Sequence, residues 1–406
     1  VYKRQALNRE IWIAQSQDDT QVALVEEGKV LEVFVEHQAV QMLRGNIYVG
    51  KVSRVVPALQ SAFVDIGLEK MAFLHVTEVV SENGHGDAQS HQPIQKLLRE
   101  GQSVMVQVTR EGVGQKGPRA TMNITLASRY LVLMPRQEQF SLSKKISNEQ
   151  ESERLRDLLP KVSGSSGLGL IARTVAEGKT QEVLEQEFDA LVEQWDEIES
   201  AYLQDRTPRK IHEDLPVALR TLRDLLDHRV GVIRVDDPKV RSDVAAFIDQ
   251  FGADFRGELR EVESSIGSEL ESNLAVETVH DKRVNLPSGG YIVIEKTEAM
   301  TTVDVNSGGN LGQKNLSATA LQTNLEATVA ISRHLRLRNI GGLIVVDFID
   351  MASDQDEAKV ASKMQELCAS DRLHCQVSDM LPFGLLAISR SRVGLPLDVA
   401  MDAAED

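Results

Sequence analysis

The sequence predicts a multidomain α+β protein, and its length, a block of short strands and a mixed C-terminal third support this prediction. With 406 residues, the chain has room for roughly two to four domains of about 150 residues. Residues 42–125 contain short apolar runs separated by turn residues, which is typical of a small β-barrel. Residues 282–394 instead alternate apolar strands with long amphipathic helices.

The elements are justified by their apolar spacing. Short alternating runs predict strands in residues 11–41, and helical spacing predicts two long helices in residues 148–214, separated by a strand. Residues 256–274 are polar and predict a helix. The remaining predictions are a hairpin at 291–307, a helix at 318–339, a buried strand at 343–351, a helix at 356–370, and strands at 373–379 and 385–392.

Composition and charge exclude several classes of protein. The 45 Lys and Arg against 61 Asp and Glu give a net charge of −16, which excludes a uniformly basic nucleic-acid binder but not a local basic surface. Residues 42–125 hold nine Lys or Arg against seven Asp or Glu, the sign that suits a polyanion. Two cysteines favour a reducing compartment, so we expect a cytoplasmic protein. No apolar run reaches the ~20 residues of a transmembrane helix.

Three oxygen-bearing side chains carry the strongest chemical signal. Asp304 and Asn306 stand two residues apart in TTVDVNS, so they project from one face of a strand. Asp347 ends a continuous apolar run that is typical of a buried strand. Two carboxylates and an amide are hard ligands that suit Mg²⁺ or Mn²⁺ rather than zinc. Residue chemistry alone leaves two interpretations equally open. One is a metal site. The other is that Asp304 and Asp347 form ordinary salt bridges and Asp350 caps a helix.

Two further groups of residues are candidates for contacts with a polyanion. Phe63 and Phe73 fall in neighbouring strands and would either stack bases on the barrel surface or fill the barrel core. Lys116, in a glycine-rich turn at 112–118, could reach a phosphate. Arg173 and Thr174 combine a fork of N–H donors with a hydroxyl, which suits a terminal phosphate, although a plain surface role stays open.

Long motifs run through almost the whole chain. They include RGNIYVGKV (44–52), AFVDIG (62–67), LIART (170–174), LPSGGYIVIEKTEAMTTVDVNSG (286–308), LRLRNIGGLIVVDFIDM (335–351) and FGLLAISRSR (383–392). In these motifs the chain resembles the catalytic region of the ribonuclease E/G family of bacterial endoribonucleases. The resemblance implies an RNase H-like subdomain (1–41 with 218–281), an S1-like OB-fold barrel (42–125), a 5′-sensor subdomain (126–217), a DNase I-like α/β catalytic subdomain (282–394) and an acidic tail (395–406).

The same resemblance implies a function and a role for each matched residue. It implies a Mg²⁺-dependent endoribonuclease, with Mn²⁺ as a substitute, that cuts single-stranded RNA such as mRNA and rRNA precursors and leaves a 5′-phosphate and a 3′-hydroxyl. The matched residues are Asp304 and Asp347 for the metal, Asn306 for orienting the scissile phosphate or attacking water, Arg173 and Thr174 for a 5′-monophosphate, and Phe63, Phe73 and Lys116 for RNA binding.

One departure from the family concerns zinc and assembly. Members share zinc between two chains through a cysteine pair after the FGLL segment, and so form homo-oligomers. Here LPLDVAMDAAED follows that segment, and Cys368 and Cys375 lie earlier with a different spacing. We therefore assign them no zinc and leave the oligomeric state open. The alternatives to an endoribonuclease are a catalytically inactive RNA-binding protein of the same fold and, third, a metal-dependent deoxyribonuclease.

Overall fold

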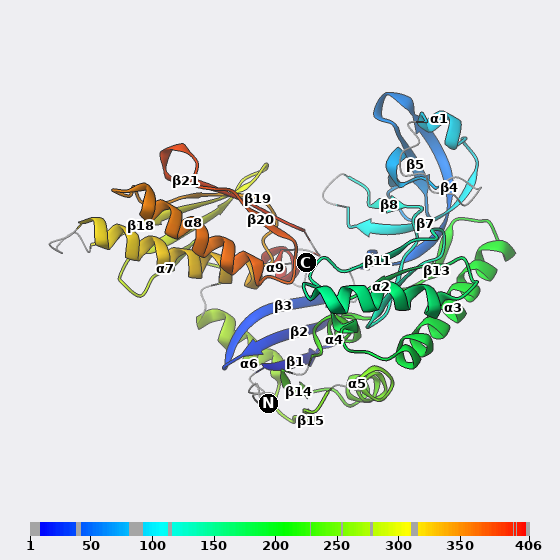
Figure 1. Ribbon diagram of the computed structural model, residues 1–406, viewed down its shortest axis with the longest axis horizontal. Coiled ribbons are helices and arrows are strands. Elements are labelled where there is room, and N and C mark those ends of the chain that lie inside the picture. The colour runs from blue at the N-terminus through cyan, green and yellow to red at the C-terminus, as the bar shows by residue number, and fades with distance from the viewer. Residues whose placement is uncertain are drawn as a thin grey trace. The chain divides into compact units, whose positions relative to one another are not determined.

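The computed structural model describes most of the chain. The described residues are 9–37, 42–80, 92–112, 116–227, 229–252, 255–276, 279–309, 316–392, 394 and 396–402. Within them the protein is a mixed α+β structure with four sheets, one of them closed into a barrel (Figure 1). The predicted fold class and the predicted barrel are confirmed. The chain divides into two compact units, residues 1–40 with 228–406 and residues 41–227. The finer division into four subdomains stays a prediction.

The first sheet of the first unit combines strands from two distant parts of the sequence. Its order is β15-β14-β1-β2-β3. The strands β1, β2 and β3 pair antiparallel, whereas β14 joins β1 in parallel and β15 joins β14 in parallel. The bounds are β1 Arg9–Gln15, β2 Asp19–Glu26, β3 Lys29–His37, β14 Val230–Val235 and β15 Glu258–Glu261. The helices of this region are α5 (Pro238–Phe251) and α6 (Ile266–Val276).

The polar stretch 256–274 corrects one prediction. We expected one helix, but Glu258–Glu261 is strand β15 and the helix α6 begins only at Ile266. An edge strand has one neighbour and tolerates a charged sequence, so backbone pairing with β14 prevails over weak helical spacing. Ile266, Leu270 and Leu274 of α6 are buried against the first sheet.

The second sheet of the first unit has helices on one face. Its order is β16-β17-β18-β19-β21-β20, and α7 and α8 lie together on one side of it (Figure 1). Alternate residues of the central strands, such as Val303 and Val346, are buried with these helices, while their neighbours on the opposite face are exposed or half-exposed. The bounds are β16 Arg283–Asn285, β17 Tyr291–Lys296, β18 Thr301–Asn306, β19 Gly342–Asp347, β20 Cys375–Val377, β21 Leu385–Arg390, α7 Leu316–Leu337 and α8 Asp354–Ala369.

A buried carboxylate joins the two sheets of the first unit. Glu32 of β3 is only 2% exposed, yet it accepts hydrogen bonds from Arg336 of α7 at 3.2 and 2.8 Å and is also bonded to Arg372. A buried carboxylate is tolerable when arginines compensate its charge in this way.

The short helix α9 (Leu397–Asp402) also packs on β3.

The second unit contains the barrel. The strands follow the order β4-β5-β6-β8-β7, and pairing of β4 with β7 closes the ring. Small and aliphatic residues such as Ala62, Val64 and Leu74 fill the interior. The bounds are β4 Ile47–Val56, β5 Ser61–Asp65, β6 Ala72–His75, β7 Ser103–Arg110 and β8 Arg119–Thr121, with β13 (Arg209–His212) paired to β4 and α1 (Ile94–Leu97) nearby.

A four-stranded sheet with two long helices completes the second unit. Its order is β11-β12-β10-β9, and its core unites residues such as Leu131, Leu170 and Trp195. The side chain of Asn148 begins α2 by accepting the backbone N–H of Glu151. The bounds are β9 Leu126–Ala127, β10 Leu131–Met134, β11 Phe140–Leu142, β12 Gly169–Ala172, α2 Glu149–Ser163, α3 Gln181–Gln204 and α4 Val217–Leu225.

Candidate functional site

Asp304 and Asp347 are register partners. They stand opposite each other near the ends of β18 and β19, which are adjacent and parallel. The buried residues Val303 and Val346 show which face of each strand points into the core, so the two aspartates lie on the opposite, exposed face. Adjacent strands lie about 4.8 Å apart, so the two carboxylates project side by side from one edge of the open face.

Asn306 lies on the same face and contacts this pair. Its Nδ2 donates a 2.7 Å hydrogen bond to Oδ2 of Asp304, which restrains that carboxylate and leaves the amide oxygen as an acceptor. In the described part of the chain, no lysine or arginine forms a salt bridge with Asp304 or Asp347. Among these described residues, no paired cation offsets the two neighbouring carboxylates, a situation that favours a bound cation.

The donor set fits a hard divalent cation. Two carboxylates and an amide oxygen are ligands that Mg²⁺ accepts, and this ion usually retains several waters and binds substrate phosphate through its other positions. No group of three or more His, Cys, Asp or Glu side chains suited to a metal exists among the described residues. The pair of carboxylates with an asparagine amide is a smaller set than such a group. Asp350 does not cap α8, because the cap is Ser353.

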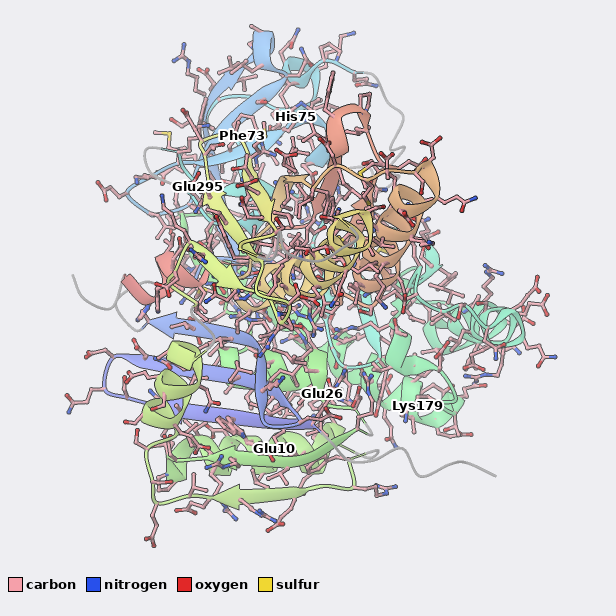
Figure 2. The ribbon with its side chains drawn as sticks, turned by 90° about the vertical axis from the view of Figure 1, so that its left-hand side faces the viewer. Glu10, Glu26, Phe73, His75, Lys179 and Glu295 are labelled. Atoms are coloured by element: carbon pink, nitrogen blue, oxygen red, sulfur yellow. The ribbon has the colours of Figure 1, made fainter. Side chains whose placement is uncertain are left out.

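Phe63 and Phe73 lie outside the barrel core. They are register partners on β5 and β6, and their rings meet edge to face with centroids 5.9 Å apart. Each ring is half-buried, whereas Ala62 and Leu74 beside them are fully buried. The alternative in which these rings fill the core is therefore wrong. Phe73 and His75, both on β6, are labelled on the pale blue barrel in Figure 2.

Arginines extend the two rings into a row across the barrel surface. Arg54 of β4 is the register partner of Phe63, and Arg119 of β8 is the partner of Phe73. The Arg119 guanidinium carbon lies 5.7 Å from the centroid of the Phe73 ring, and Arg110 of β7 pairs with Arg119 in turn. We call Arg54, Phe63, Phe73, Arg119 and Arg110 the barrel row. A row of alternating cationic and aromatic groups suits the phosphates and bases of a single strand.

Lys116 is near this row in sequence. Its side chain is exposed, three residues before Arg119. Residues 113–115 of the predicted turn lie outside the described part of the chain.

Arg173 is held by two partners at the end of β12. Its Nη1 donates to the carbonyl of Ser128 at 2.7 Å, and its Nη2 donates to Oδ1 of Asp224 at 2.6 Å. Thr174 follows directly, and its hydroxyl is 3.0 Å from the hydroxyl of Ser143. A guanidinium carries five N–H donors, so these two bonds leave the fork able to take an anion.

Two acids lie near Arg173: Glu187, which is buried, and Asp224, which is exposed. Glu187 of α3 accepts the backbone N–H groups of Tyr130 and Leu131 at 2.7 and 3.0 Å. Burial raises the pKa of Glu187 and outweighs the opposing effect of these hydrogen bonds. The surrounding protein partly desolvates the Asp224 carboxylate, which acts to raise its pKa, but the guanidinium groups of Arg223 and Arg173 prevail and hold that pKa below its ordinary value.

The structure brings some predicted residues together and adds others. Asp304, Asn306 and Asp347 meet in the first unit, whereas the barrel row and the Arg173 pair belong to the second. Sequence patterns did not reveal Arg54, Arg119 and Asp224. Their signals are weak, because an arginine in or beside a strand gains meaning only when the register of the strands is known.

No helix in the described ranges is long and apolar enough to cross a membrane.

Comparisons with known proteins agree on one family. The model of the Ribonuclease E/G family matches residues 125–393. Ribonuclease G of Haemophilus influenzae is 40% identical over 382 residues, which are 92% of this chain and 78% of that protein. Ribonuclease G of Escherichia coli K12 is 36% identical over 393 residues, 95% of this chain and 80% of that protein. Ribonuclease E of the same strain is 36% identical over 386 residues, 94% of this chain but 36% of that longer protein.

Proposed function

Because the chain belongs to the ribonuclease E/G family, we propose that it is an endoribonuclease that cuts single-stranded RNA with Mg²⁺, or Mn²⁺ in its place. The relatives named ribonuclease G and ribonuclease E support the reaction class. The observation that carries the proposal is the pairing of Asp304 with Asp347 on the open face of the second sheet, with Asn306 bonded to Asp304.

Asp304 and Asp347 would hold the cation and Asn306 would assist them. When bound, such a cation polarises a phosphoryl oxygen and lowers the pKa of a water molecule. Asn306 fixes the Asp304 carboxylate through one N–H of its amide. Its amide oxygen can accept a hydrogen bond from the attacking water, and its second N–H can donate one to the scissile phosphate. The water oxygen attacks phosphorus and gives up a proton to solvent, the bond to O3′ breaks, and O3′ takes up a proton from solvent. The products are a 5′-phosphate and a 3′-hydroxyl.

The second unit would bind the RNA outside the cleavage point. The barrel row, with Lys116, offers rings for stacking bases and guanidinium groups for phosphates. Arg173 and Thr174 offer charge-assisted N–H donors and a hydroxyl for a 5′-monophosphate. RNA processing and decay, on mRNA and rRNA precursors, is the role that this activity would serve.

The proposal is tested with charge-removing variants of similar shape. D304N and D347N are expected to lose at least about 10²-fold in cleavage rate, because each removes a full negative charge from the cation site, while RNA binding persists. E295Q is the matched control, since Glu295 is a carboxylate on β17 (Figure 2) that pairs with Lys282 at 2.9 Å on the exposed surface. It should cleave at the normal rate.

The same assay separates the alternatives. Normal cleavage by D304N or D347N would refute the metal site. RNA binding by the unmodified protein without any cleavage at saturating Mg²⁺ or Mn²⁺ would favour a catalytically inactive RNA-binding protein. Equal cleavage of single-stranded DNA of the same base order would favour a deoxyribonuclease. Chelation by EDTA followed by addition of Mg²⁺ should abolish and restore cleavage.

A further inference from the structure

An aromatic ring stands in solvent in the loop that leads into β21, the strand paired with Asp347. Phe383 lies in the connection between β20 and β21, and 88% of it is exposed, more than any other large hydrophobic residue in the described part of the chain. Leu381 in the same connection is 42% exposed. The hydrophobic effect would bury these groups if no other requirement opposed it, so their exposure calls for a specific reason.

The backbone of Phe383 is strained. Its φ is 69° and its ψ is 27°, in the left-handed region that a bulky side chain rarely adopts. Gly384 follows with a φ of 71°. Two hydrogen bonds hold this conformation, from the N–H of Leu381 to the carbonyl of Leu385 at 2.8 Å and from the N–H of Phe348 to the carbonyl of Gly384 at 3.1 Å. The ring is therefore presented by a fixed loop, and strain retained in this way is characteristic of functional sites.

The position of the loop connects the ring with the carboxylates. Leu385 is the register partner of Asp347 on β21, and Asp347 is the partner of Asp304. Phe383 thus lies two residues before the position that pairs with Asp347. A Cβ atom added at Gly384 would lie 3.0 Å from the carbonyl of Phe348 and 3.7 Å from Oδ1 of Asp350, so the loop packs directly against the residues that follow Asp347.

We propose that Phe383 is a stacking platform for an RNA base adjacent to the scissile phosphate. This inference rests on the proposed function, because it places the cleaved phosphate at Asp304 and Asp347. Bases of single-stranded RNA are unpaired and stack on exposed aromatic rings regardless of their identity. Phe383 and Leu381 are two exposed apolar residues, far fewer than the roughly 20–30 residues that a stable protein interface uses on each side. Stacking would fix the nucleotide next to the cut and so align its phosphate with the cation site.

The test separates stacking from folding by the choice of replacement. F383N removes the ring, yet asparagine tolerates the left-handed region, so its Tm should equal or exceed that of the unmodified protein. Its kcat/KM on a single-stranded RNA oligonucleotide should fall about 5- to 150-fold, the loss that corresponds to removing one stacking ring. F383Y keeps a ring and is the matched control, with kcat/KM expected close to that of the unmodified protein.

A second arm changes the RNA and leaves the protein intact. Oligonucleotides that lack one base at a time, on either side of the cut, are cleaved by the unmodified protein and by F383N. At one position beside the cut, loss of the base should slow the unmodified protein to the rate of F383N, while F383N should not respond to it.

The outcomes are distinct for this inference and for the proposed function. If F383N cleaves like the unmodified protein, or if no single missing base beside the cut slows the unmodified protein, the stacking role is overturned while the nuclease proposal stands. If the unmodified protein does not cleave RNA with Mg²⁺ or Mn²⁺, the proposed function itself fails.

Discussion

Arg173 donates a 2.6 Å hydrogen bond to Asp224, and the same carboxylate oxygen also accepts from Nε of Arg223 at 3.1 Å. A surface arginine normally samples many rotamers, but this one is held by Asp224 and by the carbonyl of Ser128. A guanidinium that is already ordered loses less conformational entropy when it binds a phosphate. For the proposed binding of a 5′-monophosphate, the ion pair with Asp224 would therefore lower the entropic cost at Arg173.

The first prediction concerns the 5′ end of the RNA. R173K keeps the positive charge but loses the planar fork, so kcat/KM on 5′-monophosphorylated RNA should fall about 10-fold, which corresponds to one charged hydrogen bond. Cleavage of the same RNA with a 5′-hydroxyl should not change. R209K is the matched control, because Arg209 pairs with Asp205 and lies on β13, in a different sheet from β12, which ends just before Arg173. An equal loss on both substrates would argue against a sensor role.

The second prediction separates the charged and aromatic members of the barrel row. R119A should weaken binding of single-stranded RNA and reduce the slope of log K against log salt by about 0.7, because one phosphate contact is lost. F73A should weaken binding by about 1–3 kcal/mol and leave the slope unchanged, since stacking releases no counterion. Fluorescence anisotropy at several salt concentrations measures both quantities.

The control for the barrel row is R99A. Arg99 is exposed in the connection before β7 and lies outside the row, so both affinity and slope should stay normal. Identical salt slopes for R119A and F73A would contradict the assignment of a phosphate contact to Arg119 and of base stacking to Phe73.

The third prediction concerns stability and pH. His334 of α7 is 3% exposed and accepts a 3.0 Å hydrogen bond from Nε of Arg338 at its Nδ1. Burial, together with the nearby Arg338 and Arg333, lowers the pKa of His334 to about 3 from an ordinary value of 6.5. The unfolded chain therefore binds this proton below pH 6.5, whereas the folded protein does not, and stability falls as the pH drops from 6.5 toward 3.

The corresponding variant is H334Q, which keeps an acceptor for Arg338 but does not titrate. The free energy of unfolding should fall with acid more steeply in the unmodified protein than in H334Q, by about 2 kcal/mol between pH 7.5 and pH 5. Urea denaturation of both proteins at the two pH values measures this difference. The carboxylates are the same in both proteins, so their contribution to the pH dependence cancels in the comparison. A constant difference in stability between the two proteins would show that His334 is not the group responsible.

Much of the fold followed from local patterns. Alternating apolar residues predicted the strands of the barrel and of the second sheet, because each strand buries one face and its period is two. The helix predicted at 256–274 failed for its first part, where pairing with β14 outweighed an ambiguous polar pattern. Such competition between local preference and a distant partner cannot be resolved from local spacing.

The candidate site, like the fold, was predictable from the sequence only in part. The spacing of Asp304 and Asn306 is enough to place them on one face of a strand, and the hydrogen bond between them agrees with this. The roles assigned to them, to Arg173 and to Thr174 remain predictions. Sequence alone left Phe63 and Phe73 between core and surface, because either face of a barrel strand accepts an aromatic ring. Packing decided the question, because Ala62 and Leu74 occupy the buried face and leave the two rings half-buried on the other.

By itself, the sequence determined the mixed α+β class, the barrel and the residue types that a divalent cation and a polyanion require. Only the tertiary structure decided that Asp347 stands beside Asp304, that Asp224 holds Arg173, and that Phe383 projects into solvent on a strained backbone. The reason is physical. Periodicity along a strand or helix is set by local backbone geometry, whereas the register between strands and the pairing of distant charges depend on how whole elements pack.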